Sequence, residues 1–449
     1  MTEPRVAIVI VTWNKKDYLI NLLESLREID YQNFSIILVD NASTDGTAEY
    51  VKEHFPDITL LLQKENIGGT GGFNAGMTYV VKQGKHDYVW LLDNDVKVEK
   101  DALRNLVLAL ENRLDSAVAG SVIRNMDFPD FTVSAGGNLD EKNMIPVNRE
   151  RNSVYISSNG IIEVEYAPSC SFLTRVKIIK EIGIFDENFF LNLDDIEWTM
   201  RVSWAGYKVL IVRNSVIYHP SFWEKGTNLV YIYYQRRNRL YFALKYIKKG
   251  NFRPVFRILL GLYWLKYQSE EKRDGLFASV VEKIIEDIKS SKMGRIENYN
   301  FSPSKQVKLV KWNNICEIIK NKKLLILPTV KGDDIKSWYN NLKQEVSLEN
   351  VFLGVEKDRR KCLSSFAFKY IDYAESSFFK KFLISFGKIA IISQETDKSE
   401  SLFNIGLLPV EEGVLVFQGS KTNWLVTFIK AFFKAFSETR YLLRNNPFK

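Results

Sequence analysis

Apolar segments and segments with helical periodicity alternate in the first quarter of the chain, and this alternation limits the possible folds more than any other feature. Leu19, Leu22, Leu23 and Leu26 illustrate the helical spacing. Strand–helix alternation of this kind predicts a mostly parallel sheet with right-handed crossovers. The segments expected to be buried strands are residues 5–13, 34–40, 58–65 and a fourth segment, "HDYVWLLDND" (residues 86–95), which ends in the triplet "DND".

Polar or glycine-rich residues follow three of these strands. Asp40 ends the second, the segment "NIGGTGGFNAGM" (residues 66–77) follows the third, and Asp93 and Asp95 end the fourth. Ligands of open α/β sheets bind outside the carboxyl ends of the strands, so we expect a ligand cleft there. Glycine allows close approach to the backbone. We therefore expect the glycines to form a loop at the mouth of the cleft, followed by a helix over residues 73–83.

The triplet Asp93-Asn94-Asp95 follows the apolar run "YVWLL". Two carboxylates one residue apart on a strand end can both bind one divalent cation. Mg²⁺ or Mn²⁺ takes its other ligands from phosphate groups and water, and would neutralise a diphosphate leaving group. The alternative is an ordinary turn, in which Asp and Asn are common. The three residues alone leave both interpretations open.

A second acidic pair, Asp194 and Asp195, opens the helical segment "LDDIEWTMR". One of the two could be a general base that takes a proton from an acceptor hydroxyl. The alternative is a capping role at the start of a helix, where the dipole stabilises anions. Glu197 and Arg201 would then be an ordinary i,i+4 pair.

Two further segments have a functional and a structural interpretation. His219, in "VIYHP", is either a metal ligand or a buried strand histidine. Arg236, Arg237 and Arg239 lie among aromatic residues in "YYQRRNR". They could bind a diphosphate or a lipid headgroup, or form the basic face of a helix.

Composition limits the partners and the compartment. The formal net charge is +8, which favours anionic partners such as sugar nucleotides or an anionic membrane. No motif supports nucleic-acid binding. The three cysteines lie far apart, which argues against a disulfide framework or a zinc site and is typical of a reducing cytoplasm. No apolar run reaches the roughly 18 residues of a spanning helix, and we find no signal peptide.

The chain is expected to have three parts: residues 1–225, a helical extension of that domain over 226–300, and a smaller α/β domain over 301–449. The last part ends in an aromatic and basic amphipathic helix. Such a helix either lies in a membrane interface or packs on its own domain or a partner chain. Trp424, Phe428, Phe432 and Phe436 share one face of this helix, and Lys430 and Lys434 lie off it.

Taken together, these segments resemble family 2 glycosyltransferases with a GT-A fold. "VTWN", "VDNASTDGT", "DND", "FDENFF" and "DDIEW" occur in the order of that family, over roughly residues 5–300. Within the family, "NIGGTGGFNAGM" and "FFLNLDDIEWTMRVSWAGYKV" look like the galactofuranosyl- and rhamnosyltransferase branch. The region after residue 300 has no resemblance that we can name, and could serve docking or oligomerisation.

The resemblance assigns roles to residues. It implies that Asp195 is the catalytic base, with Asp194 beside it, and that Mn²⁺ or Mg²⁺ is bound by Asp93, Asp95 and His219. Trp198, Asp186 and Glu187 would shape the acceptor site. The donor would be bound by Thr12, Asp40, Asn41, Gly68, Gly69, Gly71, Gly72, Asn74, Asp93 and Asn94.

The implied activity is inverting transfer of galactofuranose or rhamnose from a UDP- or dTDP-sugar to a lipid-linked or growing surface polysaccharide. The protein would be cytoplasmic, peripheral at the inner face of the membrane, and could form homo-oligomers. Asn94 departs from the fully acidic triplet frequent in this branch, which matters only if the middle residue binds metal. Two alternatives remain: an inactive carbohydrate-binding scaffold, and a sugar-phosphate nucleotidyltransferase. A nucleotidyltransferase is expected to carry a glycine-rich phosphate loop after the first strand, and this chain has none at that position.

Overall fold

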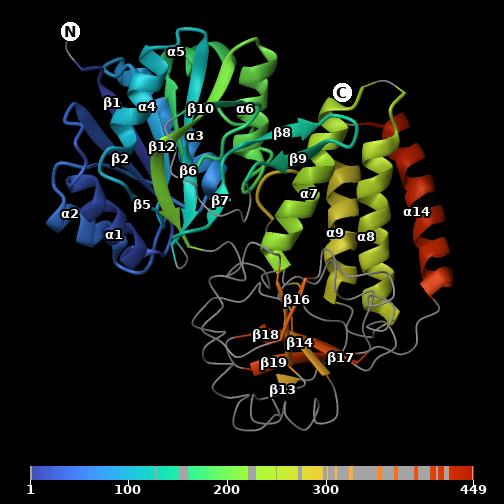
Figure 1. The fold of residues 1–449 in the computed structure, drawn as a ribbon. Helices are drawn as coiled ribbons and strands as arrows, with labels where there is room; N and C mark the ends of the chain where they lie inside the picture. Colours follow the sequence, from blue (N-terminus) through green and yellow to red (C-terminus); the bar gives the residue numbers. More distant parts are fainter. Residues whose placement is uncertain are drawn as a thin grey trace. The chain divides into compact units, whose positions relative to one another are not determined.

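The computed structural model (Figure 1) divides into two compact units, which we describe separately. Unit 1 comprises residues 1–220 and 293–297, and unit 2 comprises residues 221–292 and 298–449. The structure describes residues 3–126, 129–150, 160–220, 229–248, 250–271, 276–296, 301, 424–446 and 448, and between 302 and 423 only the seven strands given below.

A large mixed sheet forms the centre of unit 1, with the strand order β10-β12-β6-β11-β4-β1-β2-β3. The strands β1 to β4 are parallel to one another, β12 is parallel to β6, and β11 lies antiparallel between β4 and β6. This arrangement confirms the predicted mostly parallel sheet. The strands are β1 (Val6–Thr12), β2 (Phe34–Asp40), β3 (Thr59–Leu62), β4 (Tyr88–Asp93), β6 (Ser116–Asn125), β10 (Ile161–Val164), β11 (Ser171–Arg175) and β12 (Lys208–His219), with the short β5 (Lys97–Val98) and β7 (Thr132–Ser134) on its margin and a separate hairpin of β8 (Gly137–Asp140) and β9 (Ile145–Asn148).

Helices cover both faces of this sheet, so its central strands carry apolar residues on both faces along most of their length. Along β1, Ile8 and Ile10 face the core under one helix layer, and Ala7 and Val9 face the core under the other. The first layer is α1 (Lys16–Arg27), α2 (Thr47–His54) and α4 (Ala102–Glu111). The second is α3 (Gly68–Gln83), α5 (Val176–Ile182) and α6 (Asp194–Trp204).

The glycine-rich segment is not a loop, which corrects our prediction. Helix α3 begins at Gly68 and includes all five glycines. A Cβ on Gly72 would lie 2.4 Å from Val11 Cγ1, and one on Gly76 would lie 2.3 Å from Val9 Cγ1. These glycines therefore let α3 pack directly on β1. Gly68 has a φ of +76°, and a Cβ at this position would lie 2.2 Å from the carbonyl oxygen of Phe190.

We expect Gly76→Ala to lower the free energy of unfolding by about 1–3 kcal/mol, because the added methyl group overpacks the contact with Val9. Gly69→Ala is the matched control on the same helix, since its Cβ would meet only an ordinary contact at 3.7 Å. That substitution should be neutral, or stabilising by a few tenths of a kcal/mol, because Ala favours helix. Urea titration of both variants measures the difference. Equal stability of the two variants would contradict the packing explanation.

Unit 2 contains four described helices and a seven-stranded sheet. The sheet has the order β13-β19-β18-β17-β14-β15-β16. The strands are β13 (Leu309–Val310), β14 (Lys323–Ile326), β15 (Val351–Val355), β16 (Lys369–Asp372), β17 (Ile389–Ile392), β18 (Ile405–Val410) and β19 (Gly413–Gln418). The helices are α7 (Leu229–Tyr246), α8 (Arg253–Glu271), α9 (Leu276–Ser290) and α14 (Trp424–Arg444).

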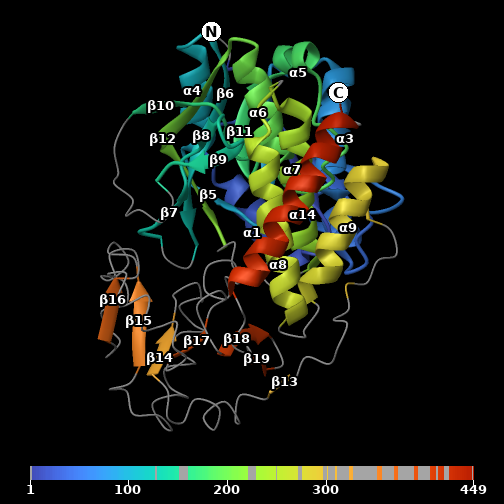
Figure 2. The same ribbon diagram turned by 90° about the vertical axis from the view of Figure 1, so that its right-hand side faces the viewer.

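The terminal helix α14 packs along α8, as Figures 1 and 2 both show. It buries Ala431 and Ala435, and the ring of Phe256 on α8 contacts those of Phe432 and Phe436. Packing within its own unit, one of the two alternatives for this helix, is therefore observed. The side chains of Trp424 and Phe428 lie outside the described residues. Within the described part of the chain, no helix is long and apolar enough to cross a membrane.

The partition of the chain into residues 1–225, 226–300 and 301–449 stays a prediction. In the structure, helices α7, α8 and α9 share a compact unit with α14. Residues 293–297 return to unit 1, where Arg295 forms an ion pair with Glu65.

Candidate active site

The carboxyl ends of β1, β2 and β4 form the base of the site. Thr12 is paired in register with Asp40, and Val11 with Asp93. Asp40 is buried and accepts a hydrogen bond from the amide of Ser43 at 3.1 Å. Three separate segments thus meet at one edge of the sheet, as their positions after the strands predicted.

Asn41 joins this edge to the start of α3. Its amide nitrogen donates to the carbonyl of Gly68 at 2.9 Å. Its side-chain oxygen is buried and has no hydrogen-bond partner. A buried acceptor without a partner costs free energy, so it favours a ligand that brings a donor to this position.

Asp93, Asp95 and His219 form a cluster whose nearest oxygen and nitrogen atoms all lie within 4.8 Å of one another. His219 Nε2 is 3.3 Å from Asp95 Oδ1 and 3.8 Å from Asp93 Oδ2. His219 Nδ1 lies 2.5 Å from the carbonyl oxygen of Pro220, which can only accept, so Nδ1 carries a proton and Nε2 faces the carboxylates.

This donor set fits a divalent cation. A neutral imidazole and two carboxylates present only lone pairs to the same small space, and a bound cation removes their mutual repulsion. Two carboxylates and one imidazole also suit Mn²⁺ or Mg²⁺, which take their other ligands from phosphate groups and water. The outer hydrogen bond from Nδ1 to Pro220 orients the ring as metal-binding histidines require.

Asn94 does not point into the metal cluster. Its amide nitrogen donates to the hydroxyl of Thr12 at 2.9 Å. The outer two residues of the triplet face His219, whereas the middle one contacts Thr12 at the end of β1. The asparagine therefore leaves the three candidate ligands unchanged.

The second acidic pair lies at the first turn of α6. Asp195 accepts from the amide of Ser169 at 2.9 Å and from that of Ile196 at 2.7 Å. Asp194 is buried and accepts from the hydroxyl of Thr70 at 2.7 Å. Burial raises the pKa of both carboxyls, and the charge of Asp195 adds to the rise at Asp194. A carboxylate with a raised pKa is a stronger base than one in water.

The backbone just before this pair is held in an unusual conformation. Phe190, Asn192 and Leu193 have φ angles of 63°, 69° and 67°, in the left-handed region that costs non-glycine residues roughly 1 kcal/mol or more each. The first turn of α3 holds this segment, because the amide of Thr70 donates to the carbonyl of Phe190 at 3.2 Å. The conformation places both carboxyl groups at the start of α6.

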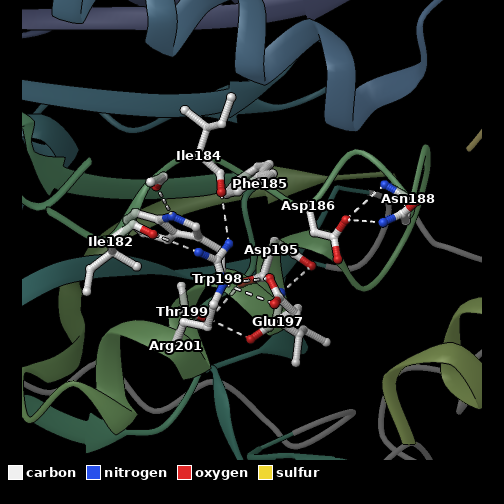
Figure 3. A network of polar contacts seen from close by, with 12 residues as sticks. Ile182, Ile184, Phe185, Asp186, Asn188, Asp195, Glu197, Trp198, Thr199 and Arg201 are labelled. Carbon is white, nitrogen blue, oxygen red and sulfur yellow. Dashed lines mark hydrogen bonds and ion pairs between the residues drawn. The ribbon is translucent and has the colours of Figure 1, made fainter. Parts of the chain in front are cut away.

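The other side of α6 is anchored in the core, as Figure 3 shows. Trp198 Nε1 donates to the carbonyl of Gly183, and Arg201 donates to those of Ile182 and Ile184. Arg201 also forms an ion pair at 3.0 Å with Glu197, which is 0% exposed. The predicted i,i+4 pair is therefore present, and it orients the helix that carries Asp195.

One short segment connects the two acidic groups. Ser169 donates to Asp195, and the carbonyl of the next residue, Cys170, accepts from the amide of Asp93 at 3.4 Å. Burial raises the pKa of the Cys170 thiol, and the charges of Asp93, Asp195 and Asp95 raise it further. Both acidic motifs thus lie close enough to act on one thiol, and they belong to one site.

Three predicted contacts need correction or refinement. Trp198 is 0% exposed and stacks on Phe172 at 5.7 Å, so it supports the core and does not contact an acceptor. Asn74 is buried and forms two hydrogen bonds with the backbone of Phe185, so its amide positions that segment, and its contact with the donor stays a prediction. Gly72 packs on Val11, as described above.

Asp186 and Glu187 lie at the surface, and Asp186 accepts from the amide and side chain of Asn188 (Figure 3). Their acceptor role stays a prediction. Thr70 and Ser169, which hold the acidic pair, were missed. No local pattern marks them, because each contacts a residue far along the sequence.

Residues 7–183 match the family described as glycosyl transferase family 2. Glycosyltransferase AglE of Haloferax volcanii is 22% identical over 225 residues, 49% of this chain and 68% of that protein. Galactofuranosyltransferase GlfT1 of Mycolicibacterium smegmatis is 25% identical, over 48% of this chain and 70% of the relative. The dTDP-rhamnosyl transferase RfbF of Shigella flexneri is 25% identical, over 47% of this chain and 67% of the relative.

Proposed function

We propose that the protein is an inverting, metal-dependent glycosyltransferase that uses a nucleotide-diphosphate sugar, since residues 7–183 match the family described as glycosyl transferase family 2. The observation that carries this proposal is that one short segment contacts both acidic groups: Ser169 donates to Asp195 of the carboxyl pair, and the next residue, Cys170, accepts from Asp93 of the cluster that could hold a metal ion. Inverting transfer needs one group of each kind, a base for the acceptor and a cation for the leaving diphosphate.

In this proposal, Asp195 takes the proton from the acceptor hydroxyl. The oxygen then attacks the anomeric carbon from the face opposite the nucleoside diphosphate, the bond to the diphosphate breaks, and the configuration inverts. Asp194 stays beside the base, held by Thr70. Asp93, Asp95 and His219 hold the cation, which when bound supplies positive charge to the leaving group. Thr12, Asp40 and Asn41 bind the nucleoside from the carboxyl ends of β1 and β2.

The proposed donor is UDP-galactofuranose or dTDP-rhamnose. Relatives named for galactofuranosyl and rhamnosyl transfer support this choice. The proposed acceptor is a hydroxyl of a lipid-linked or growing cell-surface polysaccharide, which a cytoplasmic protein would meet at the inner face of the membrane.

A donor-binding panel tests the proposal. We expect one of UDP-galactofuranose, dTDP-rhamnose, UDP-galactose or UDP-glucose to bind in calorimetry with Mn²⁺ present, and EDTA to weaken that binding. The metal requirement follows from the repulsion between Asp93, Asp95 and a donor diphosphate when no cation separates them. The absence of binding to every sugar nucleotide, with and without metal, would contradict a donor site here.

We also propose that α14 contacts an anionic membrane peripherally. Ile429, Phe432, Phe433 and Phe436 are each more than a third exposed. The exposed Lys430, Arg440 and Arg444 lie on the same helix, while its one acidic residue, Glu438, is buried and paired with Lys289 and Lys434. Aromatic side chains with a cationic surround are typical of helices at a membrane interface.

We expect Phe433→Ser, which changes the most exposed of these rings (66%), to reduce sedimentation with anionic vesicles severalfold. Binding should fall with rising salt. Leu114→Ser is the matched control, because Leu114 is also exposed but lies in unit 1. Salt-insensitive binding, or equal loss in both variants, would contradict the membrane role.

A further inference from the structure

The loop that leads into the acidic pair of α6, residues 186–193, is held by two other parts of the chain. We call it the α6 loop. Phe190, Asn192 and Leu193 in this loop have left-handed φ angles, and such a conformation persists only where the surroundings determine it. One of the surrounding contacts comes from α3, where the amide of Thr70 donates to the carbonyl of Phe190 at 3.2 Å. The other comes from a segment that follows α9.

Residues 293–296, which we call the strap, provide this other contact. The amide of Gly294 donates to the carbonyl of Asn188 in the α6 loop at 3.0 Å. The next residue, Arg295, forms an ion pair at 2.6 Å with Glu65, which precedes the start of α3. The strap therefore contacts the α6 loop and also the segment that leads into α3, the helix whose first turn holds the same loop.

The strap meets the α6 loop at a compact turn. Asp186 Oδ1 accepts from both the amide and the side-chain nitrogen of Asn188, at 3.0 and 2.8 Å (Figure 3). The carbonyl of Asp186 accepts from the amide of Phe189 at 3.1 Å. The contact from Gly294 thus fixes a turn that is hydrogen-bonded within itself. The left-handed residues lie between this turn and α6, so the loop is fixed at both ends.

The backbone of Gly294 has a conformation that favours glycine. Its φ is +77°, in the region that residues with a side chain rarely adopt. A Cβ there would have space, because the nearest atom, the carbonyl oxygen of Glu187, would be 3.9 Å away. The path of the backbone, and not close packing, therefore favours glycine at this position. That path brings the Gly294 amide to the carbonyl of Asn188.

We propose that the strap is a positioning element for the acidic pair. By holding the turn of the α6 loop, it maintains the left-handed conformation that follows, and so keeps Asp195 against the amide of Ser169. The catalytic meaning of this inference rests on the proposed function, in which Asp195 is the base. The contact between Asp195 and Ser169 can be followed without any substrate, so the strap and the transferase activity can be tested separately.

Hydrogen exchange of the full-length protein tests the strap. We expect Gly294→Ala to speed exchange about fivefold or more in the α6 loop and in the peptide that contains Ser169, because Ala disfavours a left-handed φ and the strap then leaves the loop more often. Gly250→Ala is the matched control, since Gly250 has a φ of +88° and space for a Cβ but belongs to unit 2. It should leave both peptides unchanged. Exchange that is equal in the two variants would overturn the proposal.

Transfer kinetics separate positioning from a general loss of folding. With UDP-galactofuranose or dTDP-rhamnose as donor, Gly294→Ala should lower kcat about tenfold or more, since a misplacement of about 1 Å can cost 100-fold. The KM for the donor should stay within about twofold, because the proposed nucleoside contacts lie on β1 and β2. An unchanged kcat, with or without a higher KM, would overturn the proposal. If the wild type transfers neither sugar, the proposed donors are wrong, while faster exchange around Ser169 in Gly294→Ala still supports the strap.

Discussion

Asp195→Asn is expected to reduce sugar transfer by about 100- to 10,000-fold, the range typical for loss of a general base. The substitution keeps the size of the side chain and an oxygen that can accept from the backbone, but it cannot take a proton. Donor binding should remain near the wild-type value, because Asp195 lies on α6 and the proposed nucleoside contacts lie on β1 and β2. Single-turnover transfer and calorimetric donor binding measure the two effects separately.

The pH profile gives an independent check on the same residue. Burial raises the pKa of Asp195, so the base becomes protonated at a higher pH than an ordinary carboxyl, near 4, would. As pH falls, kcat/KM should therefore decline earlier than for an exposed carboxylate. In Asp194→Asn the side-chain oxygen can still accept the hydrogen bond from the Thr70 hydroxyl, so this variant should retain more activity than Asp195→Asn. The reverse order would move the base to Asp194.

Asp93→Ala combined with Asp95→Ala is expected to abolish metal-dependent donor binding and to reduce transfer by at least about 100-fold. The double variant leaves only His219 from the cluster, and a single imidazole does not hold Mn²⁺ or Mg²⁺, which prefer oxygen ligands. Mn²⁺ binding can be followed by electron paramagnetic resonance, and donor binding by calorimetry.

Asn94→Ala is the matched control for this experiment. It lies between the two aspartates, but its side chain donates to Thr12. We expect it to retain Mn²⁺ binding within about twofold, since it supplies no ligand to the cluster. Equal loss of metal in Asn94→Ala and in the double variant would mean that the strand end, and not the carboxylates, determines binding.

Much of unit 1 could be predicted from the sequence, because its strands are buried on both faces and end in polar residues. The parallel strands β1 to β4, and the position of Asp40 and Asp93 at one edge, follow from that pattern. The start of α3 could not be predicted in this way. Glycine lowers helix propensity, but the contacts with Val9 and Val11 leave no space for a Cβ at Gly76 and Gly72.

The clustering of Asp93, Asp95 and His219 could be predicted from residue type and spacing, whereas the catalytic role of the acidic pair of α6 stays a prediction. Residues that act through tertiary contacts could not be predicted. Trp198 is next to the acidic pair in sequence but points into the core. Thr70 and Ser169 touch that pair from distant segments, and only the folded chain brings them together.

The close packing of α3 on β1 has a consequence for genetic studies of this protein. The first turn of α3 holds Asp194 through Thr70, so a methyl group added at Gly72 or Gly76 would displace the proposed catalytic pair from inside the apolar core. A screen for inactive alleles should therefore recover core substitutions alongside those of the acidic residues. The two groups would share a phenotype, and protein abundance in the cell would separate them, since only the core alleles compromise folding.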